Sequence, residues 1–252
     1  MNRARTGLKN EELDHWMEYF DPKTRPVALL WDWRALRETA FAIIRSTATT
    51  TFAGSVSGIL CDEPNPLVEG DRDHAVRLAT RAFRHLPTSP DESGPRLDLY
   101  ASAFLANRAE DDCSARVLAT DANRFLGDYA VSSLLHLRYP HVGQGESTSV
   151  LSATTVRRAE GMPAELAIRA ANALGVWHAG MDRNAARMAV ADEFGRIYRA
   201  VGMPTRIGEL GTPRNELPSV AEQTVKNFNA NAGARSVEDR IERALELLES
   251  AW

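Results

Sequence analysis

Residues 183–201 read RNAARMAVADEFGRIYRAV, and their apolar side chains recur at the spacing of one face of an α-helix. Ala186, Val190, Phe194 and Ile197 lie three or four positions apart and form one stripe, which a helix bundle would bury. The same period continues through most of the chain, and we expect further helices at residues 34–39, 40–60, 70–85, 94–109, 114–136, 163–174, 218–227 and 236–252. The sequence therefore predicts an all-α fold, a multi-helix bundle.

Two segments near the N-terminus carry different patterns. Residues 9–20 open with a capping asparagine and early acids, and then place apolar side chains on one face. We expect an amphipathic helix there that docks on the bundle. Residues 25–32 form a short and strongly apolar run, which predicts one buried strand with Trp31 and Trp33 in the core.

Composition limits the classes of partner. The 252 residues carry 30 basic and 34 acidic side chains, a net charge of -4, and the two signs are interspersed, so we expect no nucleic-acid partner. No apolar run reaches the ~18 residues of a membrane helix and no signal-peptide pattern is visible, so we expect no membrane partner and a cytoplasmic protein. Cys61 and Cys113 lie far apart, which is typical of packed thiols in a reducing compartment. A homodimer is the default assembly that we expect.

The C-terminal part of the chain carries a family resemblance. Residues 202–211, GMPTRIGELG, are followed by Leu217-Pro218 and by a closing helix that ends at Trp252. This order resembles the C-terminal end of iron-containing alcohol dehydrogenases. Residues 95–106 resemble a segment typical of the maleylacetate reductase branch of that family.

The resemblance extends towards the N-terminus. Residues 26–32 resemble the last strand before the family's helical domain, while Ser46-Thr47 and Asn65-Pro66 flank the counterpart of its first metal-ligand helix. The similarity covers residues 25–252. It implies a dehydroquinate synthase-like, iron-alcohol-dehydrogenase-like helical domain over residues 25–252, with residues 1–24 as an N-terminal extension.

The resemblance also implies a nucleotide-binding α/β domain before the helical domain and a metal held by one Asp and three His. A glycine-rich turn after a strand, which a bound pyrophosphate needs, occurs nowhere in this sequence, so we expect no cofactor held by this chain alone. The metal-ligand positions of the family fall on Thr50, Gly54, Ala130 and Gln144. None of these can act as an anionic or imidazole ligand, so we expect no metal site.

Side chains capable of acid–base chemistry gather around a glycine-containing loop near residues 138–146. His, Tyr and Glu can move protons, and an Arg can fork onto a carboxylate or an enolate. We expect the catalytic groups to be His141, Tyr139, Glu146 and Arg138, and the substrate-binding side chains to be Thr50, Ser57, His136 and Gln144. The alternative is a polar loop that caps a helix C-terminus, where His136 and Arg138 favour the dipole.

A second group of basic side chains lies on the helix predicted at residues 70–85. It consists of His74, His85, Arg72, Arg77, Arg81 and Arg84. We interpret this group as a solvated helix face and assign it no chemistry.

Three functions are compatible with these patterns. The first is a repurposed, metal-free, non-redox enzyme of specialised biosynthesis, which acts on a small-molecule substrate by isomerase, cyclase or lyase chemistry and predicts a formed cavity at the candidate site. The second is the substrate domain of a split NAD(P)-dependent reductase, completed by a separately encoded nucleotide-binding subunit; it predicts exposed apolar surface near Trp31. The third is a non-catalytic binding or scaffold protein, which predicts a closed or filled cavity. We do not expect an active iron-dependent alcohol dehydrogenase from this chain alone.

Overall fold

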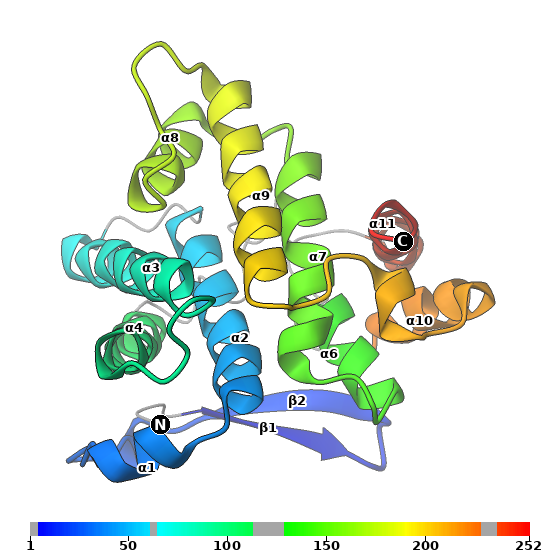
Figure 1. Cartoon of the computed structure of the whole chain (residues 1–252). Coiled ribbons are helices and arrows are strands. Elements are labelled where there is room, and N and C mark those ends of the chain that lie inside the picture. Colours follow the sequence, from blue (N-terminus) through cyan, green and yellow to red (C-terminus); the bar gives the residue numbers. More distant parts are fainter. Residues whose placement is uncertain (1–4, 61–64, 113–128, 228–235) are drawn as a thin grey trace.

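Helices dominate the computed structural model, which describes residues 5–60, 65–112, 129–227 and 236–252 (Figure 1). The α-helices are α1 (Trp33–Glu38), α2 (Phe41–Ile59), α3 (Pro66–His85), α4 (Ser93–Asp112), α6 (Tyr129–Arg138), α7 (Gln144–Arg158), α8 (Ala164–Ala173), α9 (Arg183–Ala200), α10 (Leu217–Thr224) and α11 (Val237–Ser250). Short 3-10 helices are η1 (Pro22–Thr24), η3 (Ile207–Leu210) and η4 (Arg214–Glu216). The predicted all-α bundle is confirmed.

Capping side chains fix several of these boundaries. Asn65 accepts a hydrogen bond from the Leu67 amide, so α3 begins four residues earlier than predicted. Asp182 and Ser236 cap α9 and α11 in the same way. The predicted helix 114–136 is covered only at its end by α6, and Cys61 and Cys113 also lie outside the described residues. None of the helices in the described ranges is both long enough and apolar enough to cross a bilayer.

Helices α2, α7 and α9 form the centre of the bundle, and α7 packs against both of the others. The pair α3 and α4 covers α2 on one side, while α6, α10 and α11 lie on the other side of α7 (Figure 1). Helix α8 packs on α9 and α3. This arrangement brings the N-terminus of α7 and the C-terminus of α9 close to the first half of α2.

The main core lies between α2, α3 and α9. The predicted stripe of α9 is buried, and its Phe194 joins an aromatic cluster with Phe52 of α2, Phe83 of α3 and Tyr198. The Phe52 ring centroid lies 5.3 Å from that of Phe83 and 5.5 Å from that of Phe194. A second core packs α6, α7, α10 and α11 together around Leu151.

Helix α7 was not predicted, although it is central. Its sequence is rich in serine and threonine, which favour caps and turns over helix interiors. Here the hydroxyls donate to carbonyls of the same helix: Thr148 donates to Gln144 and Ser152 to Thr148. These bonds satisfy the hydroxyls within the helix, so burial against α2 and α9 decides the conformation.

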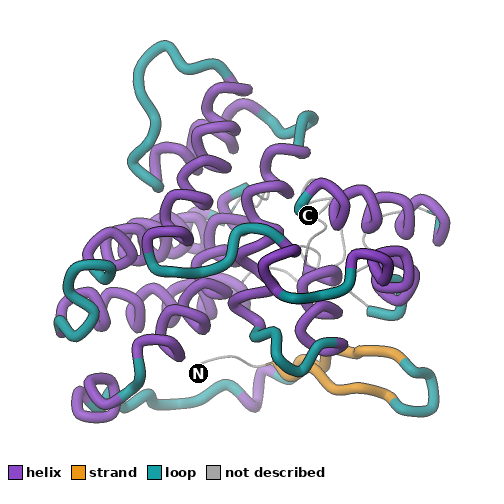
Figure 2. The backbone as a smooth tube through the Cα atoms, turned by 45° about the vertical axis from the view of Figure 1, so that its right-hand side comes forward, coloured by secondary structure: helices purple, strands orange, loops and turns teal. Residues whose placement is uncertain are grey.

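The predicted N-terminal helix at residues 9–20 is wrong. The segment is a β-hairpin of strands β1 (Arg5–Asn10) and β2 (His15–Phe20), paired antiparallel with Leu8 opposite Met17 (Figure 2). The Asn10 side chain accepts from the Leu13 amide, and Asp14 adopts a φ of 49°. This local turn reverses the chain before a helix can form.

The predicted buried strand at residues 25–32 is also wrong. Most of this segment is irregular, and Val27 and Leu30 are 105% and 95% exposed. Trp31 packs edge-on against Tyr100 of α4, with ring centroids 5.6 Å apart, but remains 47% exposed, so it is not a core residue. Trp33 begins α1 and is also exposed. The apolar side chains of Val27, Leu30 and Trp31 therefore lie at the surface of the protein and not in its core.

Candidate functional site

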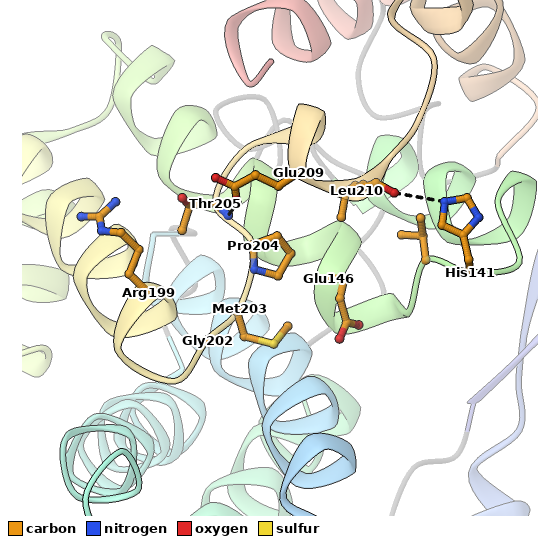
Figure 3. Close-up of a pocket in the computed structure, with 10 residues that line it drawn as sticks. His141, Glu146, Arg199, Gly202, Met203, Pro204, Thr205, Glu209 and Leu210 are labelled. Atoms are coloured by element: carbon orange, nitrogen blue, oxygen red, sulfur yellow. Dashed lines mark hydrogen bonds between the residues drawn. The ribbon is translucent and has the colours of Figure 1, made fainter.

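A cavity of about 530 Å³ lies where the N-terminus of α7 meets the loop after α9 (Figure 3). Its lining residues are His141, Val142, Glu146, Arg199, Gly202, Met203, Pro204, Thr205, Glu209 and Leu210. Two predicted catalytic residues, His141 and Glu146, are among them. The volume is sufficient for a small organic molecule.

Glu146 occupies the first turn of α7, and its carboxylate is fixed against α2. The Ser46 hydroxyl donates to Glu146 Oε2 at 2.7 Å. A negative charge in the first turn of a helix is stabilised by the free amides and the dipole of the helix N-terminus. Oε1 makes no hydrogen bond to the described part of the chain, so it remains able to accept a proton.

Two glycines make this placement of Glu146 possible. A Cβ atom on Gly143 would lie 2.2 Å from Glu146 Oε2. A Cβ on Gly145 would lie 2.1 Å from the backbone oxygen of Ser46. The missing side chain of Gly145 therefore allows α7 to approach the α2 backbone this closely, and that of Gly143 leaves room for the Glu146 carboxylate.

His141 is held in one tautomer by its backbone contact. Its Nε2 lies 3.0 Å from the carbonyl oxygen of Leu210. Because a carbonyl only accepts, Nε2 carries the proton, and in the neutral ring Nδ1 is the acceptor. The imidazole is exposed at the cavity edge (Figure 3), so it can exchange protons with a bound molecule or with solvent.

Arg138 and Tyr139 do not line this cavity. Arg138 donates to Glu216 Oε2 through Nη2 at 2.7 Å and through Nε at 3.0 Å, and the Tyr139 hydroxyl donates to the same oxygen at 2.9 Å. The hydrogen bond to Arg138 lowers the pKa of the Glu216 carboxyl, and burial raises the pKa of the Tyr139 phenol. This network ties the end of α6 to η4.

The predicted substrate-binding residues are dispersed. His136 is half-buried and its Nδ1 donates to the Ser132 carbonyl at 3.1 Å; burial lowers its pKa. Gln144 is exposed at the first position of α7, and Ser57 is half-buried on α2. The Thr50 hydroxyl is buried and has no hydrogen-bond partner within the described ranges. None of these four residues lines the 530 Å³ cavity.

The sequence did not indicate Arg199, Thr205 or Glu209 as site residues. Arg199 lies in the last turn of α9 and is exposed at the cavity rim. Glu209 Oε2 accepts from the Thr205 amide at 2.8 Å, which fixes the loop that forms one wall. A signal was present, because residues 202–211 carried the family resemblance, but nothing in their spacing indicated contact with Glu146.

Comparisons with known proteins identify the fold. No family model matches the chain, and no curated protein matches it. Among solved structures, an alcohol dehydrogenase from Oenococcus oeni is similar with a TM-score of 0.82 and 16% identity, over 99% of this chain and 62% of that protein. The chain has the fold of iron-containing alcohol dehydrogenases and maleylacetate reductases.

Two further structures support this assignment. Maleylacetate reductase from a Rhizobium species matches with a TM-score of 0.74 and 13% identity, over 100% of this chain and 63% of that one. An iron-containing alcohol dehydrogenase from Corynebacterium glutamicum matches with a TM-score of 0.72 and 15% identity, over 99% and 63%. The chain thus spans about three fifths of the length of these structures.

The residues at the family's metal-ligand positions do not fit a transition metal. Thr50 offers one neutral oxygen, Gly54 and Ala130 offer no donor, and Gln144 is exposed. A Cβ on Gly54 would lie 3.7 Å from Glu110 of α4, and α7 meets α2 at Ser46, one turn before Thr50. Within the described ranges, no three His, Cys, Asp or Glu side chains gather into a metal-binding group. We therefore derive no step through a metal.

Proposed function

We propose that this chain is a small-molecule enzyme that transfers protons without redox chemistry, of the isomerase, cyclase or lyase type, in the cavity of His141 and Glu146. The observation that carries this proposal is that two side chains able to accept a proton, those of Glu146 and His141, line one 530 Å³ cavity, and each is held by a hydrogen bond, through Glu146 Oε2 and His141 Nε2. Fixed acid–base groups are what proton-transfer catalysis requires.

The chemistry follows from the charges around the cavity. Glu146 removes a proton from a carbon next to a carbonyl; the electron pair of that C–H bond forms a C=C bond, and the π pair of the carbonyl moves onto its oxygen to give an enolate. Arg199, the one cation among the lining residues, pairs with an acidic group of the substrate or with the developing enolate. Returning the proton from Glu146 to a different carbon gives isomerisation. In elimination the enolate re-forms the carbonyl and expels the neighbouring hydroxyl group, which leaves as water with the proton that Glu146 took up.

Solvent deuterium exchange tests this step without knowledge of the full reaction. The chain is incubated in D₂O with a panel of small 2-oxo and 3-oxo carboxylic acids, and loss of the carbon-bound proton is followed by NMR. We expect accelerated exchange for at least one compound. The Glu146→Gln variant, which keeps the shape but not the basicity, should lose at least about a hundredfold of that acceleration.

A matched control separates site chemistry from general charge effects. Glu160 follows α7 and is exposed outside the cavity, so Glu160→Gln makes the same chemical change away from the site. Its exchange rate should equal that of the unchanged chain. Exchange that is no faster than in buffer for the whole panel, or that is equally fast in Glu146→Gln, would overturn the proposal.

A second candidate function is the substrate domain of an NAD(P)-dependent reductase completed by a nucleotide-binding subunit. It is favoured by exposed apolar side chains on two segments that meet where Trp31 packs on Tyr100: Val27, Leu30 and Trp31 on the first, and Leu97 and Tyr100 of α4 on the second. This function predicts exposed apolar surface near Trp31, because a partner would cover it.

The reductase alternative makes a separate prediction. Co-expression with nucleotide-binding α/β proteins of the same organism should yield a complex that oxidises NADPH with a small carbonyl substrate. Leu30→Glu should abolish both complex and turnover, while Val237→Glu on α11 should leave them intact. NADPH oxidation that Leu30→Glu leaves unchanged would exclude this surface as the contact. The scaffold alternative predicts a closed or filled cavity, and the cavity of about 530 Å³ counts against it.

A further inference from the structure

A second cavity, of about 360 Å³, lies between α3 and α8. Its lining residues are Arg77, Thr80, Arg81, Arg84, His85, Asn172, Ala173, Leu174 and Gly175. The lining thus contains three arginines and one histidine and no carboxylate, although the chain as a whole has a net charge of -4. It shares no lining residue with the cavity of His141 and Glu146.

The arginines form one row because of helix geometry. Positions 77, 81 and 84 are separated by four and three residues, so their side chains leave α3 on the same face. The row extends over about 10 Å at 1.5 Å per residue. The C-terminus of α8 at Ala173, with Leu174 and Gly175 that follow it, forms the wall of the cavity opposite this row.

Two of the arginines are held in place by acids outside the lining. Arg81 donates to both carboxylate oxygens of Asp98, at 2.6 and 2.7 Å. Arg84 donates through Nη2 to the Leu174 carbonyl at 2.7 Å and to Glu193 at 2.8 Å. These contacts order both guanidinium groups, so little side-chain entropy remains to be lost when an anion binds.

The other two basic side chains, Arg77 and His85, are not neutralised by an acid of the described chain. Arg77 is exposed, and its guanidinium makes no ion pair with any described residue; the same holds for the His85 imidazole. Thr80 lies between them in the wall, is 3% exposed, and its hydroxyl has no hydrogen-bond partner among the described side chains and backbone. The cavity therefore contains the guanidinium of Arg77 and the imidazole of His85, neither of which is in an ion pair, and the Thr80 hydroxyl, which has no partner among the described residues.

We infer that this cavity binds the phosphate group of a small phosphorylated metabolite. A phosphate dianion accepts several N–H donors from different directions, which suits a row of guanidinium groups with an unpaired member. The volume exceeds that of a phosphate ion and leaves room for an organic remainder between α3 and α8. Arg77 supplies the uncompensated charge, and the ordered Arg81 and Arg84 define the position.

Amide NMR of the full chain tests this inference with defined probes: inorganic phosphate, a hexose monophosphate, and succinate as a dicarboxylate. We expect saturable shifts at residues 77–85 and 172–175 with both phosphates. The hexose phosphate should bind more tightly than free phosphate, and succinate at least fivefold more weakly. Equal binding of succinate would overturn the phosphate assignment.

Substitution of Arg77 provides the decisive comparison. Arg77 holds no partner in the described structure, so Arg77→Ala should leave thermal unfolding unchanged and weaken phosphate binding at least tenfold, while Arg77→Lys retains part of it. Arg183 is also exposed and lies outside the cavity, so Arg183→Ala should bind like the unchanged chain. Equal phosphate affinity in Arg77→Ala and Arg183→Ala would show only general attraction to surface charge and would overturn the inference.

Discussion

The crossing of α7 and α2 makes a specific prediction about Gly145. Replacing it by alanine would place a Cβ atom 2.1 Å from the Ser46 carbonyl oxygen and 2.6 Å from the Ser46 carbonyl carbon and Cα. Real Cβ atoms do not approach other atoms below 3.0 Å, so the gap must widen by at least 0.9 Å, the difference between 3.0 and 2.1 Å. All three atoms belong to the backbone, and no side-chain rotation can relieve the contact.

The expected loss of stability is substantial. Overpacking of a core costs about 1–3 kcal/mol, and the upper end applies because α7 also packs on α9 and would lose contacts there as it moves. Alanine regains up to about 1 kcal/mol through its helix propensity. The free energy of unfolding should therefore fall by about 2 kcal/mol, which for a chain of this size lowers the Tm by about 4–8 °C.

Thermal unfolding followed by far-ultraviolet circular dichroism measures this difference. Gly70 of α3 is the matched control, because a Cβ there meets nothing within 4 Å. Gly70→Ala should leave the Tm unchanged or raise it through the gain in helix propensity. A Gly145→Ala protein with the Tm of the unchanged chain would refute the close crossing of α7 and α2.

Three further predictions concern stability and protonation. Glu216→Gln should destabilise the chain at neutral pH, because Arg138 and Tyr139 hold the folded-state pKa of the Glu216 carboxyl below its usual value. The difference in the free energy of unfolding should shrink as the pH falls, because the stabilisation by Glu216 is lost when its carboxylate is protonated. Urea unfolding of both proteins at several pH values measures this difference. Phe52→Ala should lower the free energy of unfolding by about 3–5 kcal/mol, measured by urea denaturation, because it empties the centre of the aromatic cluster. Because burial lowers the pKa of His136, its ring should titrate by NMR with a midpoint below the usual value of a histidine. Stability should then fall with decreasing pH, since the unfolded chain takes up this proton first.

The helical part of the fold could be predicted where burial follows a regular stripe. In α9 the apolar stripe of Ala186, Val190, Phe194 and Ile197 is buried, so its spacing in the sequence predicts the helix face that packs on the core. Helix α7 has no such contrast, because serine and threonine occupy many of its buried positions, and Ser147, Thr148, Ser149 and Ser152 donate their hydroxyls to carbonyls of the same helix. The N-terminal hairpin was missed for a different reason, since the turn at Asp14 depends on a positive φ that apolar spacing does not show.

The candidate site could be predicted only in part. His141 and Glu146 lie near the glycines of one loop, and the structure brings both to the same cavity. Arg138 and Tyr139 are their neighbours in sequence but point to Glu216, a residue 77 or 78 positions away that the sequence could not pair with them. Arg199 lines the cavity on the side away from His141 (Figure 3), because α9, which carries it, packs against α7.

The contact that positions Glu146 also holds the bundle together, so stability and the proposed chemistry are coupled at the crossing of α7 and α2. Substitution of Gly145 would displace both the helix and the carboxylate that it carries, so a loss of activity in such a variant could not be assigned to either cause. Glu146→Gln separates the two effects, because the amide oxygen can still accept from the Ser46 hydroxyl while the side chain can no longer take up a proton. An unchanged Tm with lost deuterium exchange in this one variant would therefore assign the proton transfer to Glu146.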